Sequence, residues 1–587
     1  MKHFIFFTIL SIPFLANTLV PIDVYAQKKP YSIEWSRCYG GSRDENGSGI
    51  PGKKMVLRTP DGGYIFAGET SSKDGDINKS RRHNDMFQQD SFKNVDIWIV
   101  KLSAGGSIEW EQYYGGEGTD YVNQILPTSD GGYVLCGETN SFSGDFPFDT
   151  SGITQIRIHG GLDDGFVMKL DSLGQKEWIS RTGGSDYDYL YTVIQTADGG
   201  YLASGSTNSN EEYWGGLSWI KHQGPWGDGF IVKLGSDGSK KWNRLYGGTG
   251  NDGISSVVEK QGGGFILCGG TNSEDGDVSK LHYKDSINSI GATGDLWIVE
   301  INTTGDIIRE KCFGGSSEDG GASITRAVDG GFLITGHTFS PDGDVVGYHM
   351  ENKDVHTADP FDAWIFKIDT ALNIVWQNCI GGSQQDGINS LIPTRSGGYA
   401  FIGSTNSSDS NLTGIHKPEN NMDIWIGELS SGGKLLWQQC FGGTANDYGN
   451  GIVENDDGGF TLFASVGSMD GDISGNHGGG PVHNRDIWVA KLRPGQVGVN
   501  SASGETHFAN PYPNPSGDQM NMYLQPTESL ERVQFFNPLG AEVFPSYQIK
   551  GTLLTADMST LANGMYIIRI TYDGRSVVEV RKFVKAN

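Results

Sequence analysis

Short signatures that recur seven times limit what this chain can fold into. The clearest is an aspartate, any residue, and then a tryptophan or phenylalanine that begins an apolar run. Successive copies lie 68, 64, 67, 67, 61 and 63 residues apart, and such a near-constant period indicates an array of structural repeats. The seven copies begin at Asp96, Asp164, Asp228, Asp295, Asp362, Asp423 and Asp486.

Two further signatures keep the same period. A tryptophan, four further residues and then Gly-Gly occur in six repeats, and Arg309 takes the place of the tryptophan in the seventh. A glycine-rich turn, mostly Asp-Gly-Gly, precedes an aromatic residue and an apolar strand, and supplies the positive φ angles of a tight hairpin. The aromatic residues are Tyr64, Tyr133, Tyr201, Phe265, Phe332, Tyr399 and Phe460.

Each repeat is expected to form four short strands. The second strand, Phe265 to Cys268 in the fourth repeat, is apolar at successive positions, so both of its faces should be buried. A blade packed between two neighbouring blades provides that environment, and four-stranded units repeated radially define a propeller. We therefore predict an all-β chain with a seven-bladed, four-stranded β-propeller, followed by a small C-terminal β-sandwich.

The two ends of the array predict how the ring closes. The mature chain begins with a strand of the fourth type, Ser32 to Tyr39, and the last repeat lacks such a strand after Leu492. The N-terminal strand should therefore pair beside residues 486–492, which completes the seventh blade and removes an exposed edge. The six cysteines occupy equivalent sites in different blades, too far apart to bridge, and are expected to be buried free thiols.

The N-terminus predicts export. Lys2 and His3 precede an apolar run that starts at Phe4, and a cut between Ala26 and Gln27 would fit a secretory signal at 1–26. No later segment of the mature chain is apolar enough to be a transmembrane span. The formal net charge of −26 argues against nucleic acid as a partner, because phosphate binding needs clustered Lys and Arg.

The candidate binding face is the one that carries the long loops between the second and third strands of each repeat. An acidic residue follows each Gly-Gly by four positions and should form a ring of carboxylates near the mouth of the channel on that face. The ring could hold a cation or a polyhydroxyl ligand, or each side chain could cap its own loop. The ring residues are Glu45, Asp120, Asp188, Asp252, Asp319, Asp386 and Asp447.

The long loops add two candidate features. Asp-Gly-Asp recurs in four of them, and His282, His349 and His477 follow three of these copies. Calcium is a possible ligand there, but the spacing matches no EF-hand, and bonds to the backbone of the loop itself are the favoured interpretation, so no metal or other cofactor is predicted. Exposed tryptophans can stack on sugars, which makes the third long loop a candidate through Trp214, Trp219 and Trp226.

No catalytic motif is present, and two classes of function remain open. The favoured one is a non-enzymatic binding or adhesion module for a glycan or a protein. The alternative is a secreted carbohydrate-active hydrolase or lyase that uses carboxylates on the same face. A catalytic site normally breaks the symmetry of a repeat array, and the evenness of these repeats favours the first class.

The repeats stop after Leu492, and a linker at 495–507 separates the propeller, at 27–494, from residues 508–587. Four segments of this last region resemble the type A sorting domain of type IX (Por) secretion: Pro511 to Pro515, Asn537 to Val543, Leu561 to Tyr566 and Lys582 to Lys585. The motif positions are Pro513, Asn514, Pro515, Gly540, Gly564, Tyr566, Lys582 and Lys585. The resemblance implies a Bacteroidota-type bacterium, the type IX secretion machinery as a partner, and release or attachment at the outer-membrane surface.

Overall fold

The computed structural model describes residues 31–46, 55–78, 95–146, 162–209, 227–282, 294–349, 360–410, 412, 414–416, 421–477, 485–494, 518–523, 530–537, 542–550, 553–572 and 578–585. The chain divides into two compact units, Met1–Pro494 and Gly495–Asn587, which are described separately below. Ala26 and Gln27 lie outside the described residues.

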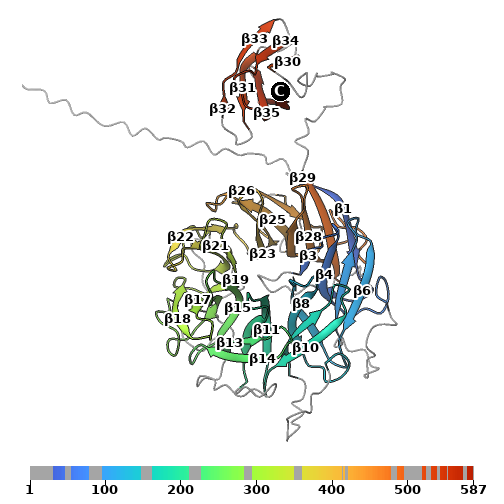
Figure 1. The fold of residues 1–587 in the computed structure, drawn as a ribbon, viewed down its shortest axis with the longest axis vertical. Coiled ribbons are helices and arrows are strands. Elements are labelled where there is room, and N and C mark those ends of the chain that lie inside the picture. Colours follow the sequence, from blue (N-terminus) through green and yellow to red (C-terminus); the bar gives the residue numbers. More distant parts are fainter. Residues whose placement is uncertain are drawn as a thin grey trace, which may run out of the picture. The chain divides into compact units, whose positions relative to one another are not determined.

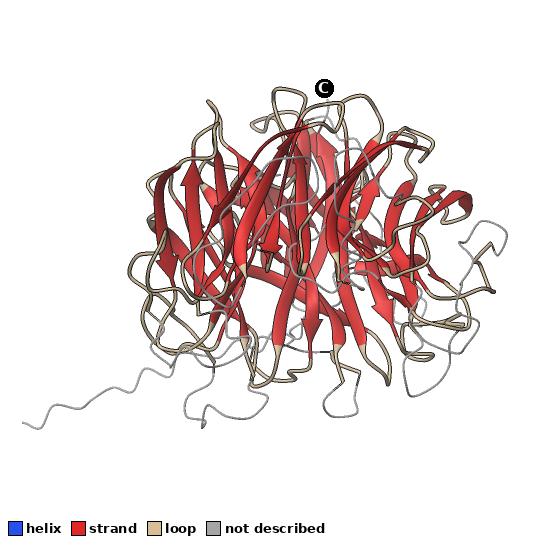
Figure 2. Ribbon diagram, turned by 90° about the horizontal axis from the view of Figure 1, so that it is seen from below, coloured by secondary structure: helices blue, strands red, loops and turns tan. Residues whose placement is uncertain are grey.

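The first unit is the predicted all-β propeller, built from seven antiparallel sheets around one axis (Figure 1). Strands of the first type lie nearest the axis and those of the fourth type at the rim, as β15 and β18 show. Seen from the side, the strands run between two ends that carry the loops (Figure 2). The prediction of seven blades is confirmed.

The strands of blades 1 to 3 are β2 (Glu45–Asn46), β3 (Val56–Arg58), β4 (Tyr64–Thr70), β5 (Asp96–Leu102), β6 (Ile108–Tyr114); β7 (Asp120–Pro127), β8 (Tyr133–Thr139), β9 (Asp164–Leu170), β10 (Lys176–Thr182); β11 (Asp188–Gln195), β12 (Tyr201–Thr207), β13 (Asp228–Leu234) and β14 (Lys240–Tyr246). Those of blades 4 and 5 are β15 (Asp252–Glu259), β16 (Phe265–Thr271), β17 (Asp295–Ile301), β18 (Ile307–Phe313); β19 (Asp319–Arg326), β20 (Phe332–Thr338), β21 (Asp362–Ile368) and β22 (Ile374–Ile380). Those of blades 6 and 7 are β23 (Asp386–Pro393), β24 (Tyr399–Thr405), β25 (Asp423–Leu429), β26 (Leu435–Phe441); β27 (Asp447–Glu454), β28 (Phe460–Val466), β29 (Asp486–Pro494) and β1 (Tyr31–Tyr39).

The N-terminal strand closes the ring as predicted. β1 pairs antiparallel with β29, from Tyr31 opposite Pro494 to Tyr39 opposite Ile487. The seventh blade is therefore completed by the two ends of the repeat array, in the order β1-β29-β28-β27. Pairing of the first and last strands leaves no open sheet edge between them.

The two middle strands of each blade form the core, because apolar residues cover both of their faces. All seven residues of β4, β5 and β17 are buried. A fully buried tryptophan stands at the third position of the third strand in five blades: Trp98, Trp297, Trp364, Trp425 and Trp488. The six cysteines are buried free thiols, as expected.

Blade 1 departs from the even pattern. Its inner strand consists of two pieces, β2 and β3, whereas β7 runs unbroken through the same register. Glu45 pairs with Thr70 and Arg58 with Tyr64, as Asp120 pairs with Thr139 and Pro127 with Tyr133. More residues separate Glu45 from Arg58 in blade 1 than separate Asp120 from Pro127 in blade 2. Blade 1 therefore carries an insertion between the two pieces of the strand nearest the channel.

The second unit is a small two-layered β-sandwich, as predicted. One sheet has the order β30 (Gln519–Tyr523), β34 (Leu553–Asp557), β33 (Ser546–Lys550), and the other β32 (Glu542–Val543), β31 (Leu530–Phe536), β35 (Gly564–Tyr572), β36 (Val578–Lys585). Residues of both sheets share one core, including Met522, Leu554, Phe535 and Ile568. Among the described residues no helix is long and apolar enough to cross a membrane.

Two of the sorting-motif residues hold this sandwich together. The Tyr566 hydroxyl donates to the carbonyl oxygen of Ala562 at 2.9 Å. The buried Lys585 ammonium donates to the carbonyl oxygens of Met558 and Leu561, each at 2.7 Å. Gly564 pairs with Lys585, and Ile567 with Lys582, in the β35–β36 ladder. Pro513, Asn514, Pro515 and Gly540 lie outside the described residues.

Candidate functional site

The seven ring acids begin the inner strands, at the end of each blade where the chain crosses from the preceding blade. All seven are buried, with at most 2% of the residue exposed. Each carboxylate accepts a hydrogen bond from the backbone N–H of the second glycine of its own Gly-Gly, for example Gly184 to Asp188 at 2.7 Å. The carboxylates therefore cap their own crossings, and ligand binding by them stays a prediction.

A second repeat motif explains the remaining bonds of the ring acids. In six blades the second strand ends on a threonine, and a serine follows in all seven at the second position after the strand. In blade 4 the hydroxyls of Thr271 and Ser273 donate to Asp252 at 2.5 and 2.7 Å. Thr-x-Ser thus ties the second strand to the crossing in six blades, and its serine, which recurs in all seven, is a sequence signal that the ring acids alone did not reveal.

Burial also makes these carboxyls hard to ionise. Loss of solvent raises the pKa of Glu45, Asp120, Asp188 and Asp386 to about 7, and that of Asp319 to about 6. A third-strand aspartate of the preceding blade adds to the effect, as Asp164 does at Asp188. The neutral acid is therefore the favoured form at mildly acidic pH.

The propeller is expected to be less stable at pH 8 than at pH 5. A carboxyl whose pKa is raised by folding contributes stability that is complete below its unfolded pKa, near 4, and is lost as the pH rises to about 7. One pKa unit corresponds to about 1.4 kcal/mol, so several such sites should lower the melting temperature by several degrees. Calorimetric melts at constant ionic strength measure the trend; Asp188→Asn should make it shallower, and a flat or rising trend would count against these pKa values.

The Asp-Gly-Asp loops fold back on the crossings. The first aspartate accepts from the backbone beyond Gly-Gly, as Asp74 does from Ser42 N–H at 2.7 Å. The middle glycine has a positive φ, 67° at Gly75, and a side chain there would collide with the carbonyl oxygen of Gly40. The second aspartate, Asp76, donates its own N–H to the carbonyl oxygen of Gly40 at 2.8 Å. These contacts agree with the favoured structural interpretation of the loops.

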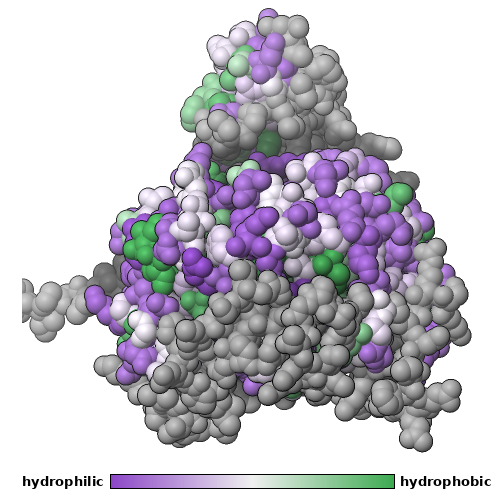
Figure 3. All heavy atoms as spheres, turned by 60° about the horizontal axis from the view of Figure 1, so that its bottom comes forward, coloured by the Kyte–Doolittle hydropathy of each residue, from purple (hydrophilic) through white to green (hydrophobic). Residues whose placement is uncertain are grey.

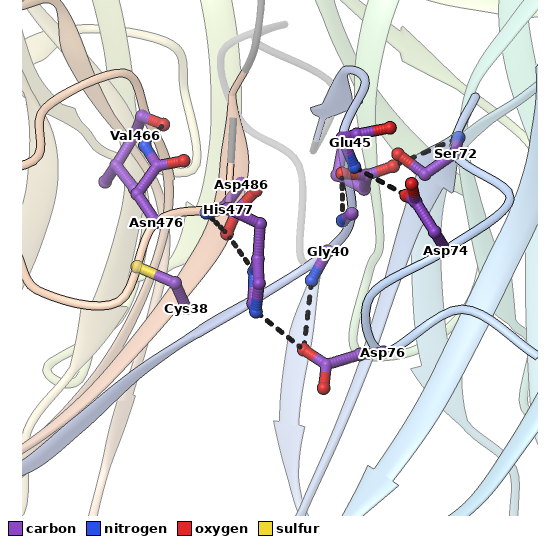
Figure 4. A network of polar contacts seen from close by, with 12 residues as sticks. Cys38, Gly40, Glu45, Ser72, Asp74, Asp76, Val466, Asn476, His477 and Asp486 are labelled. Atoms are coloured by element: carbon purple, nitrogen blue, oxygen red, sulfur yellow. Dashed lines mark hydrogen bonds and ion pairs between the residues drawn. The ribbon is translucent and has the colours of Figure 1, made fainter. Parts of the chain in front are cut away.

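The histidines of the long loops pair with the aspartates that begin the third strands. His282, His349 and His477 place Nδ1 at 2.7–2.8 Å from the carboxylates of Asp295, Asp362 and Asp486. His416, which no Asp-Gly-Asp precedes, does the same with Asp423 at 3.2 Å. Nε2 of His477 faces Asp76 of blade 1 at 4.0 Å, so the histidine stands between two blades (Figure 4).

Each blade whose loop histidine pairs with the third-strand aspartate also has a cysteine in its fourth strand. Cys312, Cys379, Cys440 and Cys38 stand in the four blades with a loop histidine. In blade 2 the same strand position carries Arg181, whose guanidinium bonds Asp164 at 2.9 Å. The small thiol leaves room for the loop histidine, whereas the arginine reaches the aspartate by itself. Among the described residues no three His, Cys, Asp or Glu side chains are grouped to hold a metal ion.

The inner-strand position after each ring acid is what breaks the sevenfold symmetry of this face. It is a tyrosine in blades 2, 3 and 7, a glycine in blades 4, 5 and 6, and Asn46 in blade 1. The tyrosines are Tyr121, Tyr189 and Tyr448. Unlike the ring acids, Tyr121 is exposed and Tyr189 is partly exposed. The repeat pattern does not mark this position, because its residue differs between repeats.

Blade 3 extends its tyrosine into a strip. The rings of Tyr187 and Tyr189 are parallel within 11° with centroids 6.0 Å apart, and those of Tyr189 and Tyr191 within 9° at 6.3 Å. Tyr187 belongs to the crossing and is 37% exposed, so the strip leads from the loop face along β11. The predicted ligand-binding residues of the third long loop, Trp214, Trp219 and Trp226, lie outside the described residues.

The inner strands also enclose a pocket of about 320 Å³ farther along the channel. Its walls are mostly apolar, and its charged residues are Arg58 and Glu454. Both already have partners, because Arg58 is bonded to Asp456 and Glu454 accepts from the N–H of Arg395.

Outside the grey parts, the surface seen in Figure 3 is mostly hydrophilic with isolated apolar patches. Scattered patches of this kind are ordinary for a protein surface.

Comparison with known families identifies the C-terminal unit. Residues 510–586 match the secretion system C-terminal sorting domain. The chain therefore carries a type IX (Por) sorting domain, which directs secretion to the outer-membrane surface or the medium. Interaction with the type IX secretion machinery follows from it.

The other comparisons give only distant likenesses to this chain. The regulatory protein FlaEY of Caulobacter vibrioides is 23% identical over 227 residues, which are 38% of this chain and 23% of that protein. The chain thus spans less than a quarter of the length of this relative. A cobalt-substituted Synechocystis ACO structure covers 63% of this chain and 78% of its own at 11% identity and a TM-score of 0.31. A DUF4221 protein from Bacteroides vulgatus covers 63% of this chain and 92% of its own at 8% identity and a TM-score of 0.27. Neither structural likeness bears on function.

Proposed function

We propose that the propeller is a non-enzymatic binding or adhesion module that holds a glycan or a protein at the surface of a Bacteroidota-type bacterium. The sorting domain supports this because it brings the propeller to the outside of the cell. The observation that carries the proposal is the tyrosine strip, in which the rings of Tyr187, Tyr189 and Tyr191 are parallel and Tyr187 is exposed on the long-loop face. Tyrosine supplies a large contact area at a small cost in conformational entropy.

The ring carboxylates support binding over catalysis. Each is buried and bonded to its own crossing, as Gly116 N–H and Ser141 Oγ bond Asp120 at 3.0 and 2.9 Å. A general acid or base must reach the atom whose proton it transfers, directly or through one water. Carboxylates held in this way serve the crossing, so the alternative of a hydrolase or lyase has no poised pair among them.

A glycan binding screen joined to a product assay tests the proposal on residues 27–494. Binding without turnover is the expected result, whereas new reducing ends or unsaturated products would establish the hydrolase or lyase. Alanine variants of Trp214, Trp219 and Trp226 test the predicted part of the third long loop in the same screen. If the propeller binds none of the glycans in the screen and no surface protein, the proposed function is wrong.

A further inference from the structure

His416 of blade 6 lies between carboxylates of two neighbouring blades. Its backbone N–H donates to Oδ2 of Asp423 at 2.6 Å, and its Nδ1 lies 3.2 Å from the same oxygen. On the other side of the ring, Nε2 lies 3.2 Å from Oδ2 of Asp472, which belongs to the Asp-Gly-Asp loop of blade 7. The ring therefore joins the long loop of one blade to the long loop of the next.

This geometry favours the doubly protonated imidazolium of His416. A carboxylate can only accept, so Nδ1 must carry a proton toward Asp423. Nε2 of a neutral ring would then be an acceptor that faces a second acceptor, the Asp472 oxygen. Among the described residues, this buried oxygen has no hydrogen-bond donor that could replace the histidine. A proton on Nε2 removes the conflict and gives both carboxylates a countercharge.

The same arrangement recurs at two further blade boundaries. His477 of blade 7 has Nδ1 2.7 Å from Asp486, and its Nε2 faces Asp76 of blade 1 at 4.0 Å (Figure 4). His282 of blade 4 faces Asp344 of blade 5 through Nε2 at 3.9 Å. At these longer distances the attraction between charges joins Nε2 to the carboxylate, since a hydrogen bond needs a closer approach.

The ionisable groups around the two histidines of blades 6 and 7 are acids and thiols. Those around His477 come from β29, the blade 1 loop, β2 and β1, and are Asp486, Asp76, Glu45 and Cys38. Those at the same positions around His416 are Asp423, Asp472, Asp447 and Cys440. Burial opposes a charge on His477, but the hydrogen bond to Asp486 and the neighbouring carboxylates raise its pKa above the ordinary value. Burial raises the pKa of the Cys38 thiol, which therefore stays neutral.

In blade 2 permanent cations bind the corresponding carboxylates. Arg181 is bonded to Asp164, the aspartate that begins the third strand, at 2.9 Å. Lys176 is bonded at 2.6 Å to Asp145, which stands in the blade 2 loop where Asp76 stands in blade 1. Arginine and a paired lysine keep their charge at neutral pH. The blade 2 loop is thus tied by charges that do not titrate in the range where histidine does.

We propose that residues 470–477 of blade 7 are held by a proton-dependent latch with one tie at each end. Asp472 is tied to the His416 imidazolium of blade 6, and His477 is tied to Asp76 of blade 1. Loss of the Nε2 proton from either ring breaks its tie, because two acceptors then face each other. The pKa of His477 is raised, so its tie is complete below the ordinary histidine pKa of about 6.5 and is lost as the pH rises through the pKa of the folded state. The latch needs no ligand and is independent of the proposed function.

Hydrogen–deuterium exchange of residues 27–587 at pH 6 and pH 8, corrected for intrinsic rates, tests the latch. We expect exchange in residues 470–477 to accelerate at least about tenfold more than exchange in residues 141–146 of blade 2, because each pH unit above a pKa lowers the protonated population about tenfold. The ring acids titrate in both blades, so the comparison removes their effect. Equal acceleration in the two segments, or none in blade 7, would overturn the latch.

Two substitutions in the tie between blades 6 and 7 separate charge from shape. His416→Asn keeps a donor for Asp423 but has no second nitrogen for Asp472, so the amides of Asp472 and Ile473 should exchange fast at both pH values. Asp472→Asn supplies an amide that can donate to a neutral ring, so the same amides should stay slow at pH 8. Melting curves confirm that both variants fold. An acceleration between pH 6 and pH 8 equal to that of the wild type in both variants would show that this histidine does not hold the loop.

Discussion

Removal of residues 27–40 is expected to abolish the cooperative melting transition of the propeller. This segment contains β1, the fourth strand of blade 7, which pairs with β29 along its whole length. Without it, β29 becomes an open edge, and the apolar faces beside Cys38 and Tyr39, both buried, are left exposed. The ring then has six complete blades and a gap, and neighbouring blades on both sides of the gap lose packing.

Circular dichroism and calorimetry of the truncated chain measure this effect. Removal of residues 495–587 is the control, since they form a separate compact unit, and should leave the propeller transition in place. Tyr39→Ala is a milder form of the same test; loss of a buried aromatic side chain costs about 3–5 kcal/mol. A truncated chain that melts like the control would show that the ring does not depend on β1.

Deletion of residues 508–587 is expected to trap the propeller in the periplasm. The sorting domain lies in this segment, whereas the N-terminal signal is predicted to provide only the first membrane passage. Lys585→Ala should have the same effect in the full-length chain, because its buried ammonium holds the carbonyl oxygens of Met558 and Leu561. Loss of a buried hydrogen-bonded charge leaves these acceptors unpaired and destabilises the sandwich.

Protease accessibility on intact cells, compared with that in lysates, measures export. Lys550→Ala is the matched control, since Lys550 is an exposed lysine in the same unit, and should be exported like the wild type. Surface display of the chain that lacks residues 508–587 would contradict the role of this segment. Display of Lys585→Ala with an unfolded sandwich would show that sorting does not need the folded unit.

The fold could be predicted from sequence because its determinants repeat. Seven copies of Asp-x-Trp or Asp-x-Phe fixed the number of blades, and the lone strand at Ser32 to Tyr39 fixed the closure. The split inner strand of blade 1 was missed because it lies in the least regular of the seven repeats. A pattern shared by the repeats predicts what all blades have in common, but it does not predict an insertion in a single blade.

The candidate site could be predicted only in part, because its asymmetric residues are not shared between the blades. The ring acids were predicted as candidate ligand-binding residues because all seven repeats have one. A residue required in every blade serves the blade itself, as the hydrogen bond from Gly184 N–H to the Asp188 carboxylate shows. The next residue along, Tyr189, is partly exposed, and the residue at this position varies between repeats. Its stacking with Tyr187 and Tyr191 depends on geometry across a crossing, which spacing in the sequence does not give.

Hydrogen–deuterium exchange of the propeller, with and without the glycan that binds it in the screen, tests most directly whether the long-loop face holds the ligand. We expect slower exchange at the crossings, residues 116–121 and 184–191, which carry Tyr121, Tyr187 and Tyr189. The turns at the other end of the same blades, residues 128–132 and 196–200, should exchange at unchanged rates. Protection of those turns with no change at the crossings would contradict the proposed binding face.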